Sequence, residues 1–149
     1  MKVLFAFCFT ILSLFSLAQS SSDDILRRAE VMPVFQQCED PNYDNAPYPC
    51  TMKQLSDYIK AAVELEETTG NITKCVVSLV VEKDGSVSNV QLPRGVFVNA
   101  ETEQEKIVLE NTLNSMIIET VEGLNFVLPA YQNGEKARVM LQFSASVNY

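Results

Sequence analysis

Cysteine is the residue type with the most distinctive chemistry in this sequence, which has 149 residues, 4 Cys and no His. The absence of His excludes the Ser–His and Cys–His pairs of nucleophilic catalysis and the usual mixed His/Cys zinc sites. The carboxylates are scattered, without the paired spacing that general acid–base catalysis needs. We therefore predict that the protein is not an enzyme and that it holds no metal and no cofactor. The cysteines could still form disulfides, which requires an oxidising compartment.

Residues 1–18 have the features of an export signal. Lys2 is followed by an almost wholly apolar run, residues 3–17, and Ser16-Leu17-Ala18 places small residues where signal peptidase reads the chain. The apolar run is shorter than the roughly 20 residues that a membrane-spanning helix needs. We therefore predict cleavage after Ala18 and a periplasmic location. Secretion, or an uncleaved N-terminal segment that anchors the protein in a membrane, remains an alternative.

Because the predicted export brings the chain into an oxidising compartment, we predict a disulfide between Cys38 and Cys50. These residues bracket a segment that is rich in Pro and Asn and shows neither a helical nor a strand period. Closing such a loop restricts the unfolded chain by on the order of 3 kcal/mol. Cys75 lies inside an apolar run, so we predict that it is a buried thiol. The sequence alone leaves the alternative open that Cys38 is free and that Cys50 or Cys75 pairs otherwise.

The rest of the chain has the composition of one small globular domain. It is 47% hydrophobic and carries a net charge of −8. An acidic chain has no surplus basic face for phosphates, so we predict no nucleic-acid partner, and we predict no small-molecule substrate. We assign residues 19–30 to a tether and residues 31–149 to the domain. Within the domain, the short segment 31–35 is apolar and broken by Pro33, and we predict that it docks extended along the domain edge.

Two helices are predicted from capping patterns followed by apolar residues at helical spacing. Thr51 and Gln54 match a capping box that opens a helix over residues 52–66. Thr102 and Glu105 match a second capping box, and the helix after it extends to Gly123.

Three strands complete the prediction. Residues 75–81 are a β-branched run of strand length, and residues 86–92 are the return strand of a hairpin. The two are joined at Asp84-Gly85, where Gly accepts the positive φ of the turn. In residues 137–149 apolar and polar residues alternate with Met140 as the only exception, which is typical of a sheet with one covered face and one wet face. The order helix, strand, strand, helix, strand predicts an α+β fold. In this fold two helices cover one face of a small antiparallel three-stranded sheet.

Several short motifs occur in the order found in the TonB C-terminal domain family. They are Val-Val-Glu-Lys-Asp-Gly-Ser-Val-Ser-Asn-Val at 80–90, Arg-Gly-Val at 94–96, Gln-Asn-Gly-Glu-Lys-Ala-Arg-Val at 132–139 and Val-Asn-Tyr at 147–149. The chain resembles this family, most strongly over residues 70–149. Residues 29–35 and the Cys38/Cys50 pair look like a stand-alone exported version common in Bacteroidota. The resemblance implies the α-β-β-α-β order and a periplasmic module whose last strand offers its edge to an extended peptide of an outer-membrane receptor.

The last strand is the predicted partner-binding site. In strand addition, main-chain hydrogen bonds give affinity and alternate side chains give selectivity. The sequence equally allows an ordinary terminal strand whose edge is blunted by charge and twist. The residues that we expect to face the partner are Arg138, Met140, Gln142, Ser144 and Ser146.

These observations predict a non-catalytic periplasmic protein-binding module that is accessory to TonB-dependent outer-membrane transport. It would bind an extended peptide of a receptor, or another envelope protein, by strand addition to the last strand. An alternative with the same fold is a membrane-anchored transport accessory with an uncleaved N-terminal helix. An alternative from another class is an exported enzyme of unknown type.

Overall fold

The computed structural model describes residues 24–39, 47–63, 65 and 70–149. The predicted leader (residues 1–18) and the first part of the predicted tether (residues 19–23) lie outside these ranges. No helix within the described ranges is long and apolar enough to cross a membrane. In chain order the elements are β1 (Ile25–Leu26), the 3-10 helix η1 (Gln36–Glu39), α1 (Pro47–Ala62), β2 (Ile72–Val81), β3 (Val87–Gln91), α2 (Glu103–Glu122), β4 (Ala130–Gln132) and β5 (Glu135–Asn148).

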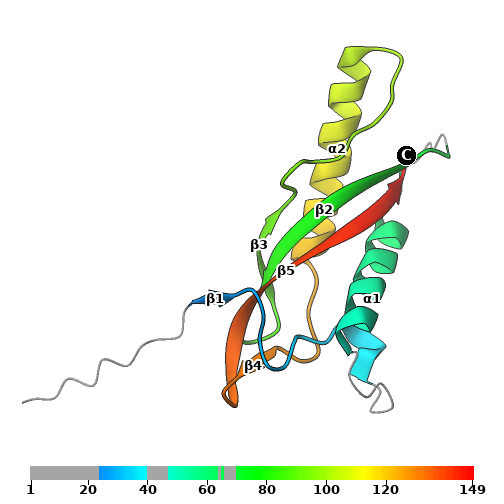
Figure 1. The fold of residues 1–149 in the computed structure, drawn as a ribbon. Coiled ribbons are helices and arrows are strands. Elements are labelled where there is room, and N and C mark those ends of the chain that lie inside the picture. Colours follow the sequence, from blue (N-terminus) through cyan, green and yellow to red (C-terminus); the bar gives the residue numbers. More distant parts are fainter. Residues whose placement is uncertain (1–23, 40–46, 64, 66–69) are drawn as a thin grey trace, which may run out of the picture.

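A mixed sheet lies at the centre of the fold (Figure 1), with the strand order β1-β5-β2-β3 and with β4 attached to β5. β2 and β5 pair antiparallel without interruption, from Ile72 opposite Asn148 to Val81 opposite Val139. α1 packs against β5 and α2 against β3. The buried side chains of both helices join alternate residues of β2 and β5 in one core cluster, so both helices cover the same face of the sheet. We call the opposite face the open face.

The α+β class is confirmed, but the prediction of a three-stranded antiparallel sheet is wrong. The structure adds β1 and β4, and β1 runs parallel to β5. These strands are only two and three residues long. A period-2 pattern cannot be recognised over such lengths, so neither strand is predicted from the sequence. A tight turn of two residues, Asn133 and Gly134, connects β4 to β5. Both residues have a positive φ, of 54° and 77°.

The predicted start of the first helix is also wrong. α1 begins at Pro47, and Thr51 is a fully buried residue inside it instead of its cap. Proline is well suited to the first helical turn, because the N–H that it lacks would have no intrahelical acceptor there. The Thr51 hydroxyl is therefore available for another contact, and it accepts the backbone N–H of Phe35 at 3.1 Å. The helix ends at Ala62, and the predicted end at residue 66 lies outside the described residues.

The predictions for the second helix and for the hairpin are confirmed. Thr102 is the N-cap of α2, and its hydroxyl accepts the N–H of Glu105 at 3.2 Å. In the turn between β2 and β3, Gly85 has a φ of 89°, and a Cβ at this position would lie 2.5 Å from the carbonyl oxygen of Phe126. Glycine is therefore required both by the backbone conformation and by the close approach of the segment after α2.

The segment before α1 docks extended on the domain, as predicted. The N–H of Val31 donates to the carbonyl of Tyr131, and the N–H of Val34 donates to that of Leu128, both at 3.0 Å. The Cys38–Cys50 disulfide then ties η1 to the first turn of α1. Cys75 is a buried free thiol, and burial raises its pKa.

Candidate functional site

The two flanks of β5 are occupied very differently. β2 covers one flank from Val139 to Asn148. On the opposite flank, β1 places Ile25 beside Arg138 and Leu26 beside Val139. From Met140 to Asn148, none of the described strands pairs with β5 on this second flank. We call this stretch of the second flank the open edge.

The hydrogen-bond register determines which backbone groups face the open edge. Asn71 and Tyr149 exchange two backbone bonds, of 3.2 and 3.0 Å, and this pair continues the β2–β5 register by one residue. In an antiparallel ladder, pairs that exchange both bonds alternate with pairs that exchange none. The N–H and C=O groups therefore point away from β2 at every second residue, namely Met140, Gln142, Ser144, Ser146 and Asn148.

The side chains of these same residues lie on the open face. Their neighbours Val139, Leu141, Phe143, Ala145 and Val147 are all buried in the core. Gln142 and Ser144 are exposed, while Met140 and Ser146 are half-buried. The structure thus places four of the five predicted partner-facing residues at consecutive outward positions of the open edge.

Arg138, the fifth predicted residue, is engaged within the protein. Its guanidinium donates to the two carboxylate oxygens of Glu82 at 2.7 and 2.9 Å, and the Ser88 hydroxyl also donates to Glu82. The hydrogen bond from Arg138, followed by that from Ser88, lowers the pKa of the Glu82 carboxyl. Glu82 directly follows β2, Ser88 lies in β3 and Arg138 lies in β5, so the network ties these three strands together at the end of the sheet where the open edge begins. Val80, which lies in register with Ser88 and Met140, is fully buried although it is outside the core cluster.

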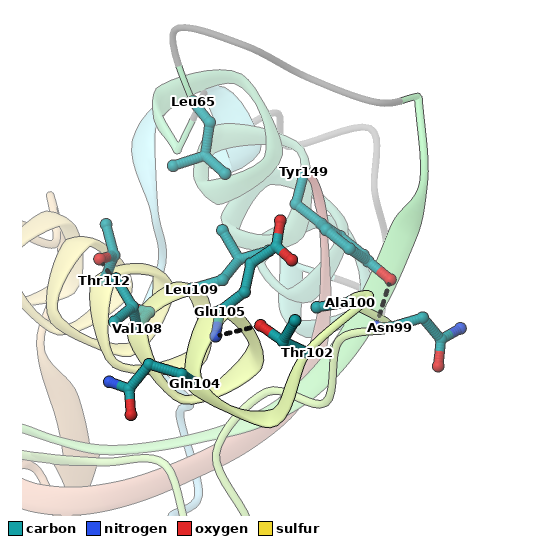
Figure 2. A pocket seen from close by; sticks show the side chains of 10 residues that line it. All are labelled: Leu65, Asn99, Ala100, Thr102, Gln104, Glu105, Val108, Leu109, Thr112 and Tyr149. Carbon is teal, nitrogen blue, oxygen red and sulfur yellow. Dashed lines mark hydrogen bonds between the residues drawn. The ribbon is translucent and has the colours of Figure 1, made fainter.

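A separate hollow of about 780 Å³ lies where the end of β5 meets α2 (Figure 2). The Tyr149 ring closes one side, and its hydroxyl accepts the backbone N–H of Asn99 at 3.0 Å. Glu105 and Tyr149 are the titratable side chains among its lining residues. The lining residues are Leu65, Asn99, Ala100, Thr102, Gln104, Glu105, Val108, Leu109, Thr112 and Tyr149.

Within the described residues, no group of three or more Cys, Asp or Glu side chains is arranged to hold a metal ion. Neither β1 nor the Glu82–Arg138–Ser88 network is predicted from the sequence. The network involves residues 56 positions apart, and only the sheet register brings them together. Comparisons with protein-family models, with curated proteins and with solved structures find no match.

Proposed function

We propose that this protein is a non-catalytic peptide-binding module that adds an extended segment of another protein to the open edge of β5. The observation that carries the proposal is the row of outward N–H and C=O groups at Gln142, Ser144 and Ser146. None of the described strands pairs with these residues on this flank. An extended peptide can satisfy these groups by becoming the next strand of the sheet.

The composition of the open edge supports binding over simple exposure. Sheets usually protect their edges with Lys, Pro, bulges or a covering segment. Residues 140–148 (Met-Leu-Gln-Phe-Ser-Ala-Ser-Val-Asn) contain no charge and no Pro, and their pairing with β2 has no bulge. The opposite edge of the sheet, β3, differs. Its pairing is irregular, and Asn89 has a φ of 48°, which twists that edge away from regular pairing.

The chemistry of recognition follows from the two faces of the sheet. Alternate side chains of a bound strand would lie over the open face, beside Gln142 and Ser144. The others would point to the side of the sheet that carries α1, which packs along β5 (Figure 1). Main-chain bonds would supply affinity for any extended segment, and these two environments would supply selectivity.

The proposal extends to the setting in which the protein works. The predicted export signal, the disulfide and the resemblance to the TonB C-terminal domain support a periplasmic module that is accessory to TonB-dependent outer-membrane transport. The bound segment would then belong to an outer-membrane receptor or to another envelope protein.

The decisive variant is Gln142→Pro. Proline removes an N–H that faces the open edge. It leaves the ladder between β5 and β2 intact, because neither the N–H nor the C=O of Gln142 bonds to β2. Gln142→Ala is the matched control, since it removes the same side chain and keeps the N–H. Ser144→Pro repeats the test at the next outward position.

The assay selects peptides from a random ten-residue library on the wild-type protein and then measures their dissociation constants. We expect Gln142→Pro and Ser144→Pro to weaken binding at least tenfold, and Gln142→Ala to change it little. Thermal unfolding shows whether each variant is folded. Unchanged binding by both folded proline variants would reject strand addition at this edge.

A further inference from the structure

Two adjacent arginines lie where the open edge begins. Arg27 and Arg28 directly follow Leu26, which is paired with Val139 of β5. Consecutive Cα atoms are 3.8 Å apart, and neighbouring strands are separated by about 4.8 Å. Because β1 runs parallel to β5 and its last pair is Leu26 with Val139, the next residue, Arg27, follows beside Met140. A strand bound to the open edge would therefore have one end next to these arginines.

The arginines border a concave surface. A hollow of about 760 Å³ lies between the segment Arg27–Met32 and the first turn of α1, where Tyr48 and Pro49 form the other wall. Arg27 and Arg28 are both exposed. Among the described residues neither arginine has an ion-pair partner, whereas Arg138 is bound by Glu82 and Lys53 by Asp57.

The neighbouring surface offers an acidic peptide little repulsion. The outward residues of the open edge are uncharged. On the open face of β2, Lys74 is the charged residue, and it pairs with Ser146. Glu82 directly follows β2, and its carboxylate is already bound by Arg138. Glu30 lines the same hollow, but its carboxylate already accepts hydrogen bonds from the Gln132 side chain and from the Asn133 N–H. Asp24 lies at the other end of β1. Arg27 and Arg28 therefore supply the positive charge at the start of this edge, in a protein with a net charge of −8.

We infer that Arg27 and Arg28 determine specificity by selecting an extended peptide whose end beside Met140 carries Asp or Glu. The inference rests on the proposed strand addition and deepens it, because it states the charge of the partner segment and the position of that charge. Guanidinium groups bind carboxylates through paired N–H donors, and both arginines line the same hollow.

The test uses synthetic peptides with uncharged, blocked termini and a common centre of alternating Thr and Val. One series carries Asp-Asp, Asn-Asn or Lys-Lys at the first two positions, and a second series carries them at the last two. Two series are needed because the bound strand can run in either direction. Dissociation constants are measured at low and high salt for the wild type, for Arg27→Glu/Arg28→Glu, for Arg94→Glu and for Gln142→Pro.

In one of the two series, we expect the Asp peptide to bind the wild type roughly tenfold more tightly than the Lys peptide at low salt. High salt should shrink this difference, because the arginines are exposed. Arg27→Glu/Arg28→Glu should reverse the preference. Arg94→Glu, a charge reversal at an exposed position beyond the end of β3, should leave the preference in place.

The failure of this inference is distinguishable from the failure of the proposed function. Equal binding of the Asp, Asn and Lys peptides, with all binding lost in Gln142→Pro, would overturn the role of the arginines and leave strand addition intact. A preference for Asp that persists in Arg27→Glu/Arg28→Glu would also overturn that role. Absence of binding for every peptide by the folded wild type would overturn both proposals.

Discussion

Replacement of both Cys38 and Cys50 by Ser should destabilise the protein by an amount that can be worked out from the structure. The disulfide joins residues separated by 12 positions. For a closed loop of this size, the lost conformational entropy of the unfolded chain corresponds to about 3 kcal/mol at 25 °C. We therefore expect the free energy of unfolding to fall by about 3 kcal/mol. The double variant leaves no unpaired thiol at this site, so the comparison isolates the cross-link.

Urea unfolding, followed by circular dichroism, measures this difference. Addition of dithiothreitol to the wild type should lower its stability to that of the double variant, and it should leave the variant unchanged. Cys75 is present in both proteins and is buried, so it does not distinguish them. A variant whose unfolding free energy lies within about 0.5 kcal/mol of the wild-type value, with an unchanged urea slope, would refute the loop-entropy reasoning.

Three further perturbations test the fold around the site. Gly85→Ala should lower the unfolding free energy by about 2 kcal/mol or more in chemical denaturation, because it combines a φ of 89° with a Cβ contact of 2.5 Å to a backbone oxygen. Thr51→Val should cost about 1–3 kcal/mol in the same assay, because it leaves the N–H of Phe35 without its acceptor in a buried position. Glu82→Gln should destabilise the protein at pH 7 and progressively less as pH falls. The folded-state pKa of Glu82 lies below the ordinary value of 4.5, so its stabilisation is present above that value and is lost as pH falls toward the folded-state pKa.

Each of these predictions has a clear contrary result. Wild-type stability of Gly85→Ala would mean that the hairpin turn is not held against the segment after α2. A neutral Thr51→Val would mean that the Phe35 N–H finds another partner. A stability difference between wild type and Glu82→Gln that stays constant from pH 7 to pH 3 would mean that the Arg138 contact does not lower the pKa of Glu82.

Periodicity explains which elements could be predicted from the sequence. β5 alternates over more than a dozen residues, so its buried and open-face residues were identified correctly, and the N-cap of α2 was identified from Thr102 and Glu105. The capping pattern at Thr51 was misleading, because the same residues also fit a helix that begins earlier at a proline. A local pattern cannot show that the Thr51 hydroxyl is taken by Phe35, which lies 16 positions away.

The candidate site could be predicted only in part for a related reason. The alternation indicated which side chains of β5 face away from the core, but the direction of the backbone groups depends on the register with β2. That register is fixed by pairs such as Asn71 and Tyr149, which are far apart in the chain. The pairing of β1 with Arg138 and Val139, which defines where the open edge begins, involves two residues without any recognisable pattern.

Amide hydrogen exchange of individual residues in β5 tests the open edge most directly. In the free protein, we expect the N–H groups of Gln142, Ser144 and Ser146 to exchange rapidly, while those of Leu141, Phe143 and Ala145, which bond to β2, exchange slowly. Addition of the tightest peptide from the library should slow exchange at Gln142, Ser144 and Ser146. Slow exchange at these three residues in the free protein would show that the edge is already covered, and it would contradict the proposed function.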